Sequence, residues 1–192
     1  MSRDAIESGP YLEAFKARGL EVCFFTEAVD QYVMEALPEF KGKKLVSADR
    51  GEIELDDVAT EGEALDEKSS ENLIEFLEKE LSERIEKVES SGRLIDSPVA
   101  ALTPKEAPNA QMRAMMQSMG QDMPVTKATL EINPRHEVIH GLAALVDSDQ
   151  DTAKLVAQQL TDNALLAAGL LENPHQMAKR MNELIAKLVA KK

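Results

Sequence analysis

The C-terminal stretch 151–192, DTAKLVAQQLTDNALLAAGLLENPHQMAKRMNELIAKLVAKK, decides the fold of this chain. Pro174 divides it into two predicted helices, because proline begins helices and does not continue them. Around 164–171 (ALLAAGLL) the first helix is apolar on every side and must be covered on every side. In the second helix, a 4-3-4 spacing forms one apolar seam from Met177, Met181, Leu184 and Leu188.

Two antiparallel helices cannot cover both of these apolar surfaces by themselves. We therefore predict a two-fold dimer whose core is a four-helix bundle, with one helix pair from each copy. The predicted dimer interface consists of Leu155, Leu160, Leu165, Leu166, Leu170, Met177, Met181, Leu184 and Leu188.

The composition excludes several classes of protein. The net charge of −13 argues against nucleic acid or an anionic membrane as a partner. The only cysteine, Cys23, excludes an internal disulfide and fits a reducing compartment, and its apolar neighbours indicate a small core residue. We find no N-terminal signal segment and no apolar run of membrane-spanning length, so we expect a cytoplasmic protein.

Hydrophobic periodicity predicts an α+β chain in three parts. Residues 1–50 form a small α/β piece, with helices at 10–19 and 26–38 and strands at 20–26 and 43–47. Residues 51–68 are an acidic linker with few large apolar side chains. Residues 69–192 form a domain that begins with an amphipathic helix and ends with the helix pair. Between them we predict a three-stranded sheet from segments 85–88, 98–102 and 126–132, and helices at 108–120 and 136–146.

Methionines gather on one face of the predicted helix 108–120. Met112, Met115, Met116 and Met119 have the spacing i, i+3, i+4, i+7. Methionine is flexible and polarizable, so such a face can repack against many apolar partners, whereas leucine or isoleucine is usual in a helix that only fills a core. We interpret the stripe as a binding surface for apolar partners. The alternative is that it docks on the sheet.

The segment HEVIH at 136–140 matches the zinc-peptidase pattern H-E-x-x-H. The two histidines would share a helix face, and Glu137 could activate water. However, Pro134 places His136 in or beside the first turn of the helix, and no third ligand is evident downstream. A zinc metallopeptidase is therefore only an alternative reading.

Several short motifs, in order along the chain, resemble the heat-shock protein 90 chaperones. Four segments resemble the end of that family's middle domain: 8–13 (SGPYLE), 19–22 (GLEV), 30–32 (DQY) and 39–44 (EFKGKK). Four further segments resemble the family's C-terminal dimerisation domain: 93–99 (RLIDSPV), 131–136 (EINPRH), 164–169 (ALLAAG) and 180–184 (RMNEL).

The resemblance implies the C-terminal part of a dimeric, ATP-driven, bacterial-type chaperone of the stress response, which binds unfolded or partly folded client proteins and supports their folding. It implies Tyr32 and the methionine helix as client-binding residues. It places ATP and Mg²⁺ in an N-terminal domain whose motifs are not found here, so we expect this chain to hold no cofactor and to have no enzymatic activity. The chain ends in 190–192 (AKK), so we expect no docking of tetratricopeptide co-chaperones. A plain dimerisation adaptor without clients remains a second alternative.

Overall fold

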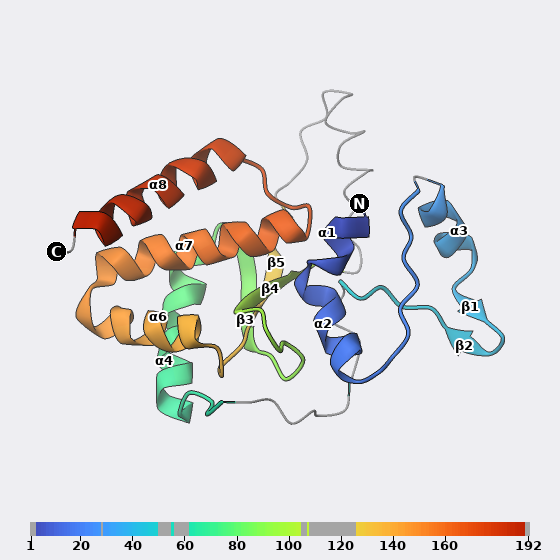
Figure 1. Ribbon diagram of the computed structural model, residues 1–192, viewed down its shortest axis with the longest axis horizontal. Helices are drawn as coiled ribbons and strands as arrows, with labels where there is room; N and C mark the ends of the chain where they lie inside the picture. The colour runs from blue at the N-terminus through green and yellow to red at the C-terminus, as the bar shows by residue number, and fades with distance from the viewer. Residues whose placement is uncertain are drawn as a thin grey trace.

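The computed structural model of the chain describes residues 3–27, 29–49, 55, 62–104, 107 and 126–190. Figure 1 shows a group of helices packed on a small sheet, with an N-terminal piece beside it. The N-terminal elements are α1 (Arg3–Glu7), α2 (Pro10–Ala17), α3 (Asp30–Ala36), β1 (Glu39–Phe40) and β2 (Lys43–Lys44). The larger part contains α4 (Glu67–Leu81), β3 (Ile85–Ser90), β4 (Val99–Leu102), β5 (Ala128–Ile132), α6 (Glu137–Ser148), α7 (Gln150–Ala167) and α8 (Pro174–Ala190).

The larger part is built on a three-stranded mixed sheet with the order β3-β5-β4. The central strand β5 runs parallel to β3, with Val88 opposite Leu130, and antiparallel to β4, with Ala101 opposite Leu130. Burial alternates along β5, as expected for a strand with one face on the core. All three strands lie within or close to the segments predicted for them, and the α+β class is confirmed.

The core lies between this sheet and the helices α4, α6 and α7. Helix α4 packs on β3, α7 packs on β4 and β5, and α6 contacts both helices. The predicted amphipathic helix exists, and its apolar face contributes three almost completely buried side chains, Leu73, Leu77 and Leu81. It begins at Glu67, where the Asp66 carboxylate caps it by accepting a hydrogen bond from the Ser69 N–H at 3.0 Å.

The predicted C-terminal pair is present as α7 and α8, which are joined by a short turn around Asn173. Asp149 caps α7 by accepting a hydrogen bond from the Thr152 N–H at 3.1 Å. Figure 1 shows α8 lying along the outer side of α7, away from α4 and α6. The described helices include none that is long and apolar enough to cross a membrane.

The N-terminal piece has less regular structure than its sequence predicts. Strands β1 and β2 form a short hairpin through Lys41 and Gly42, both at positive φ (50° and 77°), the backbone form that matches the twist of paired strands. The predicted strand at 43–47 shrinks to this two-residue strand β2.

The prediction of a strand at 20–26 was wrong, because these residues form no strand. Leu20 and Phe25 are 49% and 46% exposed, and Cys23 is exposed and not a core residue. A short apolar run becomes a strand only where a neighbouring strand satisfies its backbone groups, and the described residues supply no such neighbour.

Helix α2 attaches this piece to the sheet domain, at the loop 91–98. Its apolar side chains Leu12 and Phe15 are buried, and the half-buried Tyr11 donates a hydrogen bond to the Ala101 carbonyl at 2.5 Å. Burial, and to a lesser degree the charge of Asp49, raises the pKa of the Tyr11 hydroxyl above its ordinary range, so it remains a donor.

Candidate functional site

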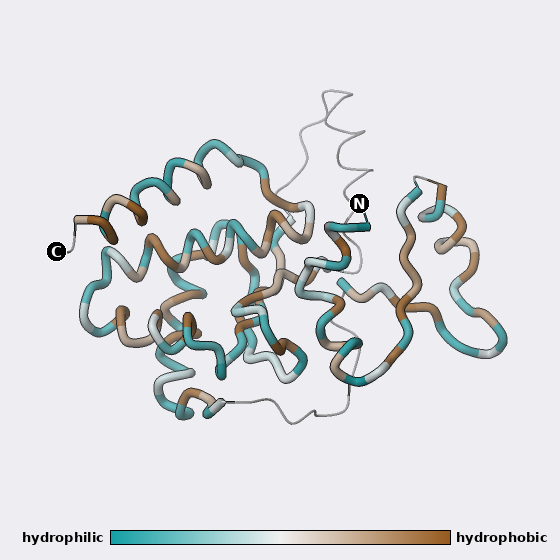
Figure 2. The backbone as a smooth tube through the Cα atoms, in the orientation of Figure 1, coloured by the Kyte–Doolittle hydropathy of each residue, from teal (hydrophilic) through white to brown (hydrophobic). Residues whose placement is uncertain are grey.

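The strongest candidate site is the surface formed by α7 and α8. The side of α7 that faces the sheet is lined by small and apolar residues, including Ala153, Ala157 and Leu165, which are at most 4% exposed. In contrast, α8 buries a single residue, Arg180, along its whole length. Figure 2 shows hydrophobic and hydrophilic stretches recurring within successive turns of α8, as expected for an amphipathic helix with one apolar face.

One face of α8 exposes a continuous apolar stripe, which we call the α8 stripe. It comprises Met181, Ile185, Leu188 and Val189, which are 41%, 51%, 74% and 70% exposed. The spacing i, i+4, i+7, i+8 places all four on one side of the helix. Leu166, at the end of α7, adds a further leucine at 55% exposure.

A second face of α8 lies against α7. It contains Arg180 together with the half-buried Met177 and Leu184, and Lys187, whose ammonium donates to the Thr152 hydroxyl at 2.9 Å. Because successive helix residues are about 100° apart, this face and the α8 stripe are centred roughly a quarter turn apart. Each helix of a four-helix bundle contacts two neighbours in about this way.

The nine predicted interface residues differ in how far their own chain covers them. Leu165 lies in the core of its own chain, and Leu160 and Leu170 are partly buried against that core. Leu155, Met177 and Leu184 are half-buried. Leu166, Met181 and Leu188 are exposed. The structure thus brings the predicted residues together on one helix pair and leaves the last three accessible.

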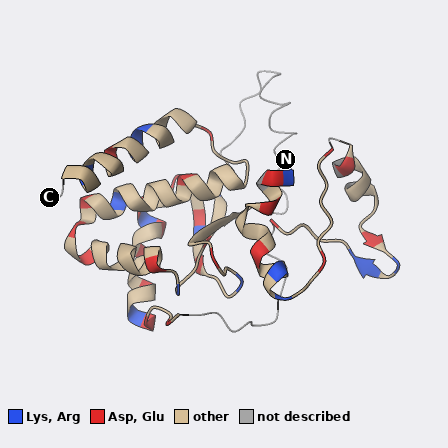
Figure 3. Ribbon diagram, in the orientation of Figure 1, with Lys and Arg blue, Asp and Glu red and all other residues tan. Residues whose placement is uncertain are grey.

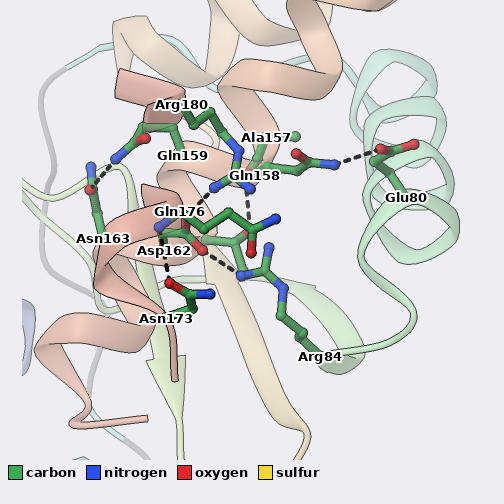
Figure 4. A network of polar contacts seen from close by, with 11 residues as sticks. Glu80, Arg84, Ala157, Gln158, Gln159, Asp162, Asn163, Asn173, Gln176 and Arg180 are labelled. Atoms are coloured by element: carbon green, nitrogen blue, oxygen red, sulfur yellow. Dashed lines mark hydrogen bonds and ion pairs between the residues drawn. The ribbon is translucent and has the colours of Figure 1, made fainter. Parts of the chain in front are cut away.

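Sequence reasoning missed a buried charged cluster beneath α8. The carboxylate of Asp162, on α7, pairs with Arg180 of α8 through Oδ2 and with Arg84 through Oδ1. The Asp162 side chain is 3% exposed, and the side chains of Arg180 and Arg84 are 10% and 31% exposed. Figure 4 shows the two arginines reaching the carboxylate from different sides. The available signal was a charged residue, Asp162, just before the apolar run 164–171.

The charges around this cluster are sparse. Figure 3 shows α7 and α8 as mostly uncharged ribbon with isolated acidic and basic positions. Beside Asp162, the Gln158 amide donates to Glu80 of α4 at 2.9 Å, and Gln159 donates to Asn163 at 3.0 Å. The cluster is therefore the main charged contact beneath α8 within the described residues.

Of the predicted client-binding residues, the structure describes Tyr32, which lies on α3 and not on the helix pair. The Tyr32 side chain is 70% exposed. Val29, Val33 and Leu37 have the spacing of one helix face with Tyr32 and are 61%, 47% and 40% exposed. Met112, Met115, Met116 and Met119 lie outside the described residues.

The HEVIH segment has a structural role in the part of the chain that is described. His136 is the N-cap of α6, and its Nδ1 accepts a hydrogen bond from the Val138 N–H at 3.0 Å. The His140 Nε2 lies 3.1 Å from the Glu63 carbonyl oxygen. Among the described residues, no group of three or more His, Cys, Asp or Glu could hold a metal ion. The peptidase reading gains no support.

The comparisons with known proteins agree with one another. A family model described as "Hsp90 protein" matches residues 1–192. The chaperone protein HtpG of Desulfitobacterium hafniense is 37% identical over 190 residues, which cover 97% of this chain and 31% of that relative. The HtpG proteins of Geobacter sulfurreducens and Psychrobacter arcticus are 35% and 38% identical over 98% and 95% of this chain and 30% and 28% of their own lengths. The chain spans about 30% of the length of these curated relatives.

Proposed function

Since the chain belongs to the Hsp90 family, we propose that it is the dimerisation and client-binding region of an ATP-dependent molecular chaperone. In this proposal the chain acts as a scaffold and binding surface, has no enzymatic activity and holds no cofactor. ATP and Mg²⁺ bind in another domain of a longer parent, as the resemblance implies. A cytoplasmic location is part of the same proposal.

The exposed α8 stripe is the observation that carries the dimer. Four apolar side chains on one helix face, at 41–74% exposure, favour a partner that removes them from water. A second copy is the occupant we propose, because its own helix pair carries the same stripe and a two-fold axis makes such a surface complementary to itself. The α8 stripe lies about a quarter turn from the side of α8 that faces α7, as expected for a helix with two neighbours in a bundle of two helix pairs.

A dimer gives the chaperone its working geometry. Joining two chains raises the effective concentration of any arms attached to them, so both can act on the same client. Within the described residues, the exposed face of α3 around Tyr32 offers one apolar surface for that client. The proposed methionine face at 112–119 is a second surface, and it rests on the sequence pattern alone.

The dimer is tested with a substitution on the α7-facing side of α8. Leu184→Asp places a charge between α8 and its neighbours and should give monomers, with about 2–5 kcal/mol lost from the leucine packing alone. Sedimentation velocity measures the mass. A Leu184→Asp variant that sedimented as a stable dimer would contradict the proposed bundle.

The client surface is tested by replacing Met115 and Met116 with serine. This change should preserve the dimer and weaken suppression of the aggregation of a heat-denatured model protein, measured by light scattering. The matched control replaces both residues with leucine, which keeps the apolar volume and loses part of the adaptability of methionine. If the serine variant suppresses aggregation as well as the unmodified chain does, the result contradicts the client-binding role of the methionine face and favours the alternative of a plain dimerisation adaptor.

A further inference from the structure

The way in which α8 is held on α7 is unusual for an amphipathic helix. Such a helix normally docks by burying apolar residues, but the single buried residue of α8 is a charged one, Arg180. The apolar residues on its α7 side, Met177 and Leu184, are only half-buried. Apolar contacts have little directionality, so these two residues alone cannot fix how α8 is turned about its axis.

The partner of Arg180 is itself held in place by the sheet domain. Asp162 accepts from Arg180 with one carboxylate oxygen and from Arg84 with the other. Arg84 lies in the turn before β3, and its carbonyl accepts the Ala128 N–H of β5 at 3.1 Å. Hydrogen bonds between ionised groups are strong and directional. The contacts from Ala128 through Arg84 and Asp162 to Arg180 therefore fix α8 relative to the sheet.

We propose that Asp162 is the positioning residue of the dimer: through Arg180 it fixes the rotation of α8 and so determines which face of that helix meets a second copy. With a side chain 3% exposed in the single chain, Asp162 is not itself available to a partner. This inference rests on the proposed dimer and adds to it a residue outside the contact surface.

The need for such a residue follows from the two faces of α8. A rotation by about a quarter turn would bring the α8 stripe onto α7 and remove it from the partner. Apolar content does not oppose this rotation, because both faces carry large apolar residues. The rotation would carry Arg180 away from Asp162 and leave this buried carboxylate with Arg84 as its remaining charged partner in the cluster, and the loss of a charged partner in a buried site is unfavourable. The ion pair thus disfavours the unproductive arrangement.

Arg180→Met is the cleaner variant for a test. It removes the anchor from α8 while Asp162 stays paired with Arg84, and methionine replaces the apolar stem of the arginine. Removing Asp162 instead would leave two guanidinium groups facing each other. Lys179→Met is the matched control, because it removes the same charge from the neighbouring exposed position. Arg180→Lys keeps the charge and serves as the conservative variant.

Two measurements separate this inference from the dimer proposal. The first is the dissociation constant of the dimer, from sedimentation at several concentrations. We expect Arg180→Met to raise it by at least about tenfold, Lys179→Met to change it by less than about twofold, and Arg180→Lys to lie between them. Equal effects of Arg180→Met and Lys179→Met would overturn the positioning role. If Arg180→Met fails to fold, Arg180→Gln and Lys179→Gln, which remove the same charges and keep a polar side chain, are compared by the same criterion.

The second measurement is amide hydrogen exchange in monomers made with Leu188→Asp. Adding Arg180→Met should speed exchange along α8 and leave β3, β4 and β5 protected, because only the anchor of α8 is lost. Unchanged exchange along α8 would overturn the inference. This comparison needs no dimer, so a wild-type chain that stayed monomeric would remove the proposed dimer while the role of Asp162 in holding α8 was still tested.

Discussion

Glu13 and Ser97 join two parts of the chain that are 84 residues apart. The Glu13 carboxylate accepts hydrogen bonds from both the backbone N–H and the side-chain hydroxyl of Ser97, at 3.1 and 3.0 Å through Oε2. It also accepts the N–H groups of Ile95 at 2.9 Å and Asp96 at 3.3 Å. One side chain of α2 thereby satisfies three successive backbone donors of the loop in the sheet domain.

Replacing Glu13 with glutamine should loosen the attachment of α2. Glutamine has one acceptor oxygen in place of two charged ones, so backbone donors of the loop lose their partner. We expect a loss of roughly 1–3 kcal/mol in the free energy of unfolding, measured by chemical denaturation, and faster amide exchange at residues 95–97.

The matched control for this change is Glu7→Gln. Glu7 pairs with Arg3 at 2.7 Å, but the pair is exposed, with side chains 41% and 74% accessible. Exposed pairs contribute little, so this variant should change stability by no more than about 0.5 kcal/mol. Equal losses in the free energy of unfolding for both variants would show that the Glu13 contacts stabilise the chain no more than an exposed ion pair does.

Asp66 predicts a pH dependence for the start of α4. Hydrogen bonds from Ser69 lower the pKa of the Asp66 carboxyl below its ordinary value of 3.8. A lowered folded-state pKa means that the charged form favours the folded chain above the unfolded pKa, and this advantage is lost as the pH falls through the folded value. Asp66→Asn should therefore melt below the unmodified chain near neutral pH, with the gap closing below about pH 4. Thermal melts of both proteins from neutral pH to below about pH 4 check this prediction. A difference in melting temperature that did not change with pH would rule out the charge effect.

The exposed face of α3 predicts a client-binding role for Tyr32. Because this side chain is 70% exposed, Tyr32→Ser should leave the melting temperature within about 1 °C and weaken binding of an unfolded model client, measured by fluorescence anisotropy. Tyr32→Phe is the control, since it keeps the aromatic surface. Undiminished binding by the serine variant would remove α3 from the client surface.

A chelator should have no effect on the chain. The Nδ1 of His136 already serves as the acceptor that caps α6, and the described residues offer no third ligand. Adding excess EDTA should leave the melting curve unchanged, and no peptidase activity should appear when zinc is added. A fall in melting temperature with chelator, reversed by zinc, would revive the metal reading.

Local patterns in the sequence predicted the parts of the fold that depend on local chemistry. Alternation and β-branched residues located β5, and apolar spacing with Pro174 located both C-terminal helices. The same reasoning failed at 20–26, because an apolar run cannot show whether a partner strand exists. It could not pair Asp162 with Arg84 and Arg180, nor Glu13 with Ser97, because those contacts depend on how distant elements pack.

The same limit applies to the candidate site. The seam of α8 was visible as a 4-3-4 spacing, so its apolar character was predictable. Which residues face α7 and which remain exposed depends on the rotation of the helix, which we propose is controlled by the ion pair of Arg180 with Asp162. The division of the seam into a half-buried set and an exposed set therefore emerged only from the structure.

The most direct test of the proposed dimer is the mass of the chain in solution, measured by sedimentation velocity over a dilution series. We expect the unmodified chain to sediment as two copies and Leu188→Asp as one, because Leu188 is 74% exposed in the single chain and its replacement harms only a partner contact. The control Val138→Asp alters another exposed apolar residue, on α6, and should remain a dimer. An unmodified chain that stayed a folded monomer at all concentrations would contradict the claim that a second copy covers the α8 stripe.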